Sequence, residues 1–137
     1  MCIFSNLPAE EAVIMLTVLY VLAEFGIEYS SKDDRDDRKI SYLVGTTYVN
    51  YKERNVKSID PAIEEVAKVY NTDKSSVHTA MSDLLSNTFR QTSPEQFTKL
   101  SRLHLQPQDL TVTSFVCGIV QHLLNHPEKM GTTSISI

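Results

Sequence analysis

Hydrophobic residues recur along much of the chain with the three-to-four-residue spacing of amphipathic α-helices. This spacing, with the residues that commonly begin and end helices, predicts helices over about residues 8–25, 60–70, 75–88, 93–103 and 113–126. The first of these is apolar on nearly all sides, which is typical of a helix in a central position. Gly26 is a natural end for it, because glycine readily adopts the left-handed conformation.

The regions outside these helices are less regular. Residues 28–39, EYSSKDDRDDRK, mix both signs of charge without apolar periodicity, which predicts a solvent-exposed loop. Residues 40–56 are rich in the β-branched and aromatic residues of strands, yet their apolar residues also lie three and four apart. Their helical neighbours favour a further helix. Residues 128–137 have no helical pattern and predict a mobile tail.

Several helix starts carry recognisable capping residues. Asp60, Pro61 and Glu64 match a capping box at the start of the 60–70 helix. Asp73 or Ser75 can cap the helix that follows. The helix at 93–103 is expected to begin with a cap, a first-turn proline and a glutamine at the third position, supplied by Ser93, Pro94 and Gln96.

These elements predict an all-α protein of about six helices, with a helical core over about residues 8–126. A length of 137 residues, 42% of them hydrophobic, suits one domain with one sizeable core. Because no repeat or long linker divides the chain, residues 1–137 are expected to form a single domain. Two helices joined by a short polar turn, at 60–70 and 75–88, match a helix-turn-helix.

Charge and composition narrow the class of protein. A net charge of −4 argues against strong unspecific binding to nucleic acid, although a specific reader can still be acidic overall. The apolar run at residues 12–23 is shorter than a membrane span and follows Glu10 and Glu11 rather than basic residues. Cys2 and Cys117 lack metal or redox spacing and are expected to be reduced thiols. We therefore expect a cytoplasmic protein without a membrane segment.

No pattern of catalytic chemistry is present in the sequence. There is no glycine-rich phosphate loop and no nucleophile elbow. His122 and His126 are four residues apart on one helix, but no acidic third ligand accompanies them. The sequence therefore predicts neither an enzyme, nor a metal site, nor a cofactor, nor a small-molecule substrate.

The segment VAKVYNTDKSSVHTAMSDLL, residues 66–85, resembles a known family of DNA-binding domains. It is similar to the C-terminal effector domain of the sporulation master response regulator of spore-forming Firmicutes. The matching positions are Val66, Ala67, Tyr70, Asn71, Thr72, Ser75, Val77, Ala80 and Met81. The segments LAEFGI (22–27), Tyr42-Leu43 and LTVTSFVCGIVQHL (110–123) follow the family in the same order.

The resemblance covers about residues 10–126. It implies a six-helix, winged-helix-like effector domain with a helix-turn-helix that docks in the major groove. It also implies binding to tandem DNA sites as a dimer.

This chain departs from the family in three ways. It is too short to hold the phosphorylatable receiver domain, so its own aspartyl phosphate is not expected to switch it. The charged stretch 28–39 looks like an insertion. The arginines of the family's recognition helix fall here on Ser76, Thr79 and Ser82, and residues 60–88 hold two lysines against five acids.

Two functions follow from these observations. In the first, the chain is a DNA-binding transcription regulator: base edges are contacted by Ser75, Ser76, His78, Thr79 and Ser82, and phosphates by Lys74, Arg90, Lys99 and Arg102. In the second, the loss of the arginines leaves an interaction module that pairs with itself or with another regulator.

Overall fold

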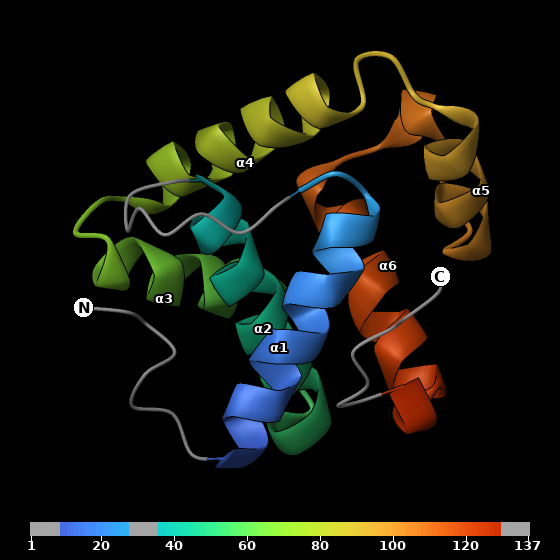
Figure 1. Cartoon of the computed structure of the whole chain (residues 1–137). Coiled ribbons are helices and arrows are strands. Elements are labelled where there is room, and N and C mark those ends of the chain that lie inside the picture. Colours follow the sequence, from blue (N-terminus) through green and yellow to red (C-terminus); the bar gives the residue numbers. More distant parts are fainter. Residues whose placement is uncertain (1–8, 28–35, 130–137) are drawn as a thin grey trace.

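The computed structural model describes residues 9–27 and 36–129, which form six α-helices and two 3₁₀ turns without any strand (Figure 1). The helices are α1 (Ala9–Glu24), α2 (Asp36–Arg54), α3 (Asp60–Val69), α4 (Lys74–Thr88), α5 (Pro94–Arg102) and α6 (Val112–Asn125), and the 3₁₀ turns are η1 (Pro107–Asp109) and η2 (Pro127–Lys129). The predicted all-α class with six helices is confirmed. The winged-helix-like form is wrong for this part of the chain, because a wing is built from β-strands.

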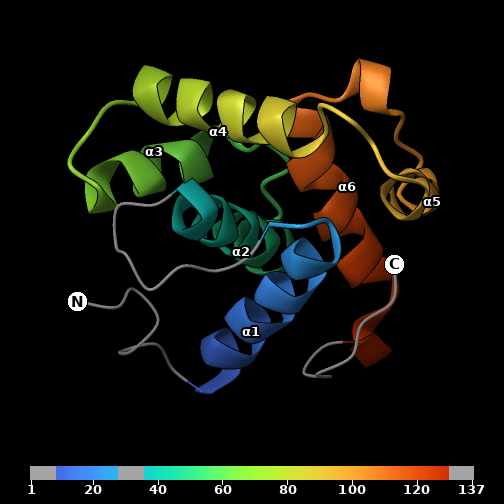
Figure 2. The same ribbon diagram turned by 45° about the horizontal axis from the view of Figure 1, so that its top comes forward.

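Helix α2 lies at the centre of the molecule and packs against α1, α3, α4 and α6 (Figure 2). Its core residues Ile40, Leu43 and Val44 are fully buried. The hydroxyl of Thr47, also buried, donates a hydrogen bond to the carbonyl of Leu43 at 2.7 Å, so its polar group is satisfied within the helix. The strand-like composition of residues 40–56 is thus accommodated in a helix, because helices surround it and residue propensity yields to packing.

The predicted loop at residues 28–39 is wrong in its last part, because α2 begins at Asp36. Within this part Arg38 is only 2% exposed, so a charged residue of the segment lies in the interior. A pattern of charges could not reveal that burial. Residues 28–35 of the predicted loop lie outside the described residues, as do residues 130–137 of the predicted tail. Glu128 and Lys129, the first residues of that tail, belong to η2.

Three helices end in the same hydrogen-bonded turn, in which one residue adopts a left-handed conformation. Gly26 (φ 90°) ends α1, Asn71 (φ 55°) ends α3 and His104 (φ 62°) ends α5. At the first of these ends, Ile27 N donates to Leu22 O and Gly26 N donates to Ala23 O, both at 3.0 Å. The prediction that Gly26 ends the first helix is confirmed.

Two of the three capping predictions are confirmed, and one is wrong. Asp73 caps α4, and Ser93 with Gln96 forms the predicted capping box of α5. The box predicted at Asp60 is wrong, because the buried Ile59 is the N-cap of α3 and no side chain caps it. The carbonyl of Ile59 accepts the first bond of the helix from Ile63 N at 2.9 Å, so the N-cap lies one residue earlier than expected.

A cluster of three phenylalanines joins the ends of α1 and α4 to the start of α6. The rings of Phe25, Phe89 and Phe115 pack edge to face, with centroids 5.4 to 6.0 Å apart. Gln96 ties α5 to the same region: its side-chain amide donates to Phe25 O at 2.9 Å and to Thr88 O at 3.4 Å. The first turn of α5 therefore satisfies backbone carbonyls at the ends of two other helices.

Replacement of Gln96 by alanine tests this tie. Gln96→Ala removes both the capping box of α5 and the donor to Phe25 O and Thr88 O. We expect the free energy of unfolding to fall by about 1–3 kcal/mol in urea denaturation. Gln91→Ala, at an exposed position before the same helix, should change it by less than about 0.5 kcal/mol. Equal effects of the two substitutions would contradict this role of Gln96.

Candidate nucleic-acid interface

Helix α4 runs along the surface of the molecule (Figures 1 and 2). One side of the helix is buried and the other is exposed. Val77, Met81 and Leu85 are its buried residues, and the helix packs against α2, α3 and α6. Its 15 residues span about 22 Å. The three buried side chains fix the rotation of the helix about its axis, so they decide which residues face outward.

A short turn connects α3 to α4. Asn71 takes the left-handed conformation in which glycine is common, and Thr72 N donates to Ala67 O at 2.9 Å. Ala67 is buried, and its small side chain suits the close approach of α3 and α4. Asp73 then begins α4 by accepting a hydrogen bond from Ser76 N at 2.7 Å. The orientation of α4 is therefore set locally by the turn and by its cap.

The residues predicted to contact bases are displayed unequally on α4. Four of them are exposed, and these are Ser75, Ser76, His78 and Thr79. Ser82 is half-buried, and together with His78 it lines a groove of about 280 Å³ whose other side includes Pro107 and Leu110. The first two turns of α4 thus offer the most accessible polar surface.

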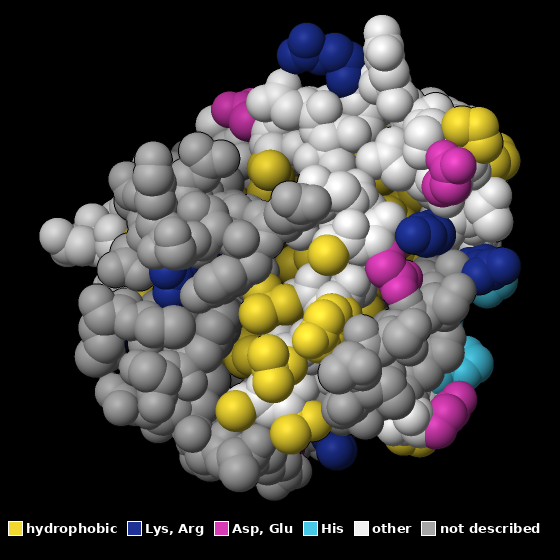
Figure 3. Space-filling model, in the orientation of Figure 1, with side chains coloured by type: hydrophobic (Ala, Val, Ile, Leu, Met, Phe, Trp, Pro, Cys, Tyr) yellow, Lys and Arg dark blue, Asp and Glu magenta, His cyan; other side chains and the backbone are white. Residues whose placement is uncertain are grey.

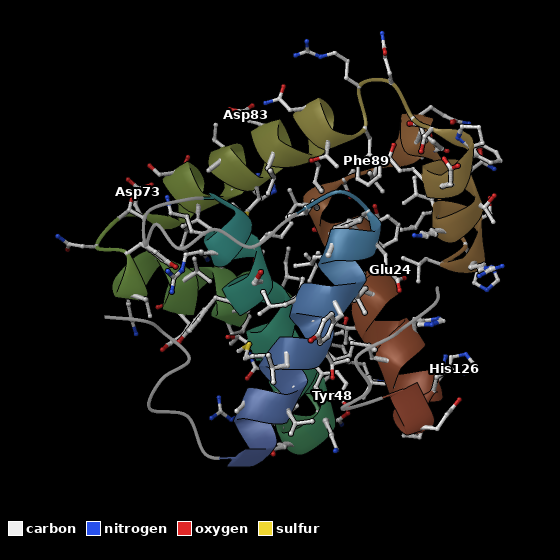
Figure 4. The ribbon with its side chains drawn as sticks, viewed as in Figure 1. Glu24, Tyr48, Asp73, Asp83, Phe89 and His126 are labelled. Carbon is white, nitrogen blue, oxygen red and sulfur yellow. The ribbon has the colours of Figure 1, made fainter. Side chains whose placement is uncertain are left out.

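The predicted phosphate contacts fall into two groups. Lys74 is exposed at the start of α4, and Arg90 is exposed just beyond its end, where its guanidinium donates to Asn87 Oδ1 at 3.0 Å. Lys99 and Arg102 lie on α5 instead. The Lys99 amine donates to Glu24 O at 2.9 Å, so it caps the carboxyl end of α1. Figure 4 shows Glu24 far from Asp73, the N-cap of α4. The Lys99 amine, which bonds to Glu24 O, is therefore also distant from the start of α4.

Two carboxylates also lie on the outer side of α4, as the labels in Figure 4 show for Asp73 and Asp83. The Asp73 side chain is exposed, and the hydrogen bond from Ser76 N holds the pKa of its carboxyl below the ordinary value of 3.8. Lys74 is the one basic residue within α4. A phosphate approaching the amino end of α4 would therefore meet a positive and a negative side chain next to each other.

The two histidines that are four residues apart, His122 and His126, lie close together at the end of α6. The rings of His122 and His126 have centroids 4.6 Å apart, and His126 Nδ1 lies 3.2 Å from Glu128 Oε1. Among the described residues, no three or more His, Cys, Asp or Glu side chains are placed to hold a metal ion. In the same part of the chain, no helix has both the length and the apolar character needed to cross a membrane.

Cys117 lies on α6 beside a tyrosine of α2. The Tyr51 hydroxyl is 3.2 Å from Cys117 Sγ. Partial burial, followed by the neighbouring sulfur, raises the pKa of Tyr51 to about 12. The Tyr51 hydroxyl is therefore neutral at physiological pH and joins α2 to α6 through this contact. The other cysteine, Cys2, lies outside the described residues.

Comparison with protein-family models, with curated proteins and with solved structures finds no match for this chain.

The stability that the Asp73 cap contributes should depend on pH. Because its pKa is lowered in the folded state, the carboxylate stabilises the fold above pH 3.8, and this contribution is lost as the pH falls below that value. Asp73→Asn keeps a capping oxygen without the charge. We expect the melting temperature of the wild type to fall more than that of Asp73→Asn between neutral and strongly acidic pH.

Asp73→Ala provides the matched control, because it removes the cap as well as the charge. At neutral pH it should lower the melting temperature further than Asp73→Asn does. Parallel melting curves for the wild type and Asp73→Asn across the whole pH range would show that the charge of Asp73 contributes nothing.

Proposed function

We propose that this protein is a DNA-binding transcription regulator, in which α3 and α4 form a helix-turn-helix and α4 enters the major groove. One observation carries the proposal: α4 is held against the core by three buried residues while its outer side presents small polar side chains to solvent. The major groove is about 12 Å wide and admits one α-helix. A helix displayed along the surface in this way suits that groove (Figure 1).

In this proposal, the exposed residues in the first two turns of α4 contact base edges. These residues are Ser75, Ser76, His78 and Thr79, and Ser82 joins them from the side of the groove that it lines. Lys74 and Arg90 contact phosphates from the two ends of α4. Lys99 and Arg102 on α5 contact phosphate beyond these ends. The resemblance of residues 66–85 to the sporulation effector domain supports the same assignment, and with it a cytoplasmic protein that binds DNA as a dimer.

The composition of α4 predicts weak rather than tight recognition. Each bidentate arginine–guanine pair that is missing removes about 1–3 kcal/mol of discrimination. Serine and threonine would each make a single hydrogen bond to a base where arginine makes two. Asp73 and Asp83 add repulsion toward phosphate, so the affinity should depend on two copies binding adjacent sites and on low salt.

A selection experiment tests the proposal directly. Duplexes enriched from a random pool at low salt would serve as ligands in fluorescence anisotropy. We expect Lys74→Ala and Arg90→Ala each to weaken binding to all selected duplexes, and each to reduce the salt slope by about 1, because each removes one phosphate contact. Asp73→Asn should tighten binding, because it removes a negative charge beside the phosphates and keeps the cap.

Lys57→Ala is the matched control, since Lys57 is an exposed lysine in the connection between α2 and α3. It should leave both the affinity and the salt slope unchanged. The proposal fails if no duplex is enriched over the input pool, or if Lys57→Ala weakens binding as much as Lys74→Ala.

A second candidate function is an interaction module that pairs with itself or with another regulator. The apolar side of α1 favours it: Val13, Leu16 and Tyr20 are 39%, 53% and 40% exposed and follow one another at helical spacing. Figure 3 shows hydrophobic side chains gathered over α1. Exposed apolar patches commonly mark protein–protein contacts.

Sedimentation velocity separates the second candidate from the first. If α1 pairs with a second copy, Leu16→Ser should shift the wild-type dimer to monomer without changing the melting temperature by more than a few degrees. A wild-type monomer at all accessible concentrations, with no change on substitution, would rule out pairing with itself through α1.

A further inference from the structure

A cavity of about 470 Å³ lies between α1, α2 and α3, apart from the residues assigned to DNA. Its apolar wall comes from all three helices and consists of Ile14, Met15, Val49 and Pro61. Asn50 and Arg54 line it from the carboxyl half of α2. The rest of the lining is polar or charged, so the cavity combines an apolar wall with several polar groups, as sites for small molecules do.

Asn50 supplies an unusual polar group to this cavity. Its side chain is only 3% exposed, and its Oδ1 accepts a hydrogen bond from Arg54 Nη1 at 3.2 Å. A guanidinium can only donate, so this bond fixes which end of the amide is the oxygen. No side chain or carbonyl among the described residues accepts a hydrogen bond from Asn50 Nδ2. This nitrogen is not among the buried polar atoms that lack a partner, so it stays open to water, and a ligand in the cavity can replace that water as its acceptor.

The charges around the cavity distinguish its two ends. Arg54 is exposed next to Asn50, so a cation and an amide donor lie together at that end. Twelve residues earlier on α2, about 18 Å away, the Tyr42 hydroxyl donates to Glu65 Oε1 at 3.5 Å. Glu64, Glu65 and Lys68 line the cavity from α3 and together carry one net negative charge. A carboxylate on a ligand would therefore be attracted to the Asn50–Arg54 end and repelled from α3.

We propose that this cavity binds a small carboxylic acid with an apolar body. One carboxylate oxygen accepts from Asn50 Nδ2 and the other from the Arg54 guanidinium, a geometry that suits the two oxygens of a carboxylate. The apolar body packs against Ile14, Met15 and Val49. The inference does not rest on DNA binding, because the cavity residues of α1 and α2 have no part in the α4 surface.

Titration with sodium hexanoate, followed in ¹⁵N–¹H correlation spectra of the full chain, tests the site. We expect saturable shifts of the Asn50 side-chain amide and of the backbone amides that line the cavity. Hexanamide has the same apolar body without the charge, and its affinity should be lower by about tenfold or more.

Three variants sharpen the test. Arg54→Gln should weaken hexanoate binding by about tenfold, and Lys52→Gln, which removes a charge from the same last turn of α2 outside the cavity, by less than about twofold. Asn50→Asp keeps the acceptor for Arg54 but replaces the donor with a carboxylate, so it should abolish binding. Equal binding of hexanoate and hexanamide, equal effects of Arg54→Gln and Lys52→Gln, or shifts confined to residues outside the cavity would each overturn the proposal.

Discussion

The burial of α2 is the constraint on which the rest of the structure depends. Four other helices pack against it, and its Ile40, Leu43 and Val44 are removed from solvent completely. Such a helix is stable only while those neighbours stay in place, because its apolar surface has no other cover. Gly45 shows how close the contact is: a Cβ atom at that position would collide with the Met15 thioether of α1. The positions of α1, α3, α4 and α6 are thus set largely by what they cover.

The orientation of α4 follows from the same constraint. Its buried residues point toward α2, α3 and α6, so the side chains on the opposite side of the helix face solvent. The phenylalanine cluster and the Gln96 hydrogen bonds hold the far end of α4 beside α1 and α5. The outer surface of α4 is therefore held in one orientation, as the proposed DNA-reading role requires. The polar side chains of α4 are mainly serine and threonine, with one histidine and a single lysine.

Much of this fold could be predicted from the sequence, because helix ends are local features. Gly26, Asp73 and the Ser93–Gln96 box act within one turn of chain, and each was recognisable from residue type and spacing. The failures lie where tertiary burial decides. Helix α2 begins at Asp36 in a segment whose Arg38 is buried, and the N-cap of α3 is the buried Ile59 rather than Asp60. Local patterns of charge and capping do not report such burial.

The candidate site was predictable in part for the same reason. Helical periodicity placed Ser75, Ser76, His78 and Thr79 on the outer side of α4. It could not show that the Lys99 amine bonds to Glu24 O, since the two residues are 75 positions apart in the chain. The place of the Asn50 amide in the cavity could not be predicted either, because it depends on how α1, α2 and α3 meet.

The proposed role of α4 can be mapped directly by titrating ¹⁵N-labelled protein with a selected DNA duplex at low salt. The proposal predicts that the largest amide shifts fall at residues 74–79, with further shifts near Arg90, and that an equal amount of unselected duplex causes smaller shifts at the same positions. Shifts concentrated on α1 with residues 74–79 unchanged, or no shifts at any DNA concentration, would contradict a DNA-reading function for this helix.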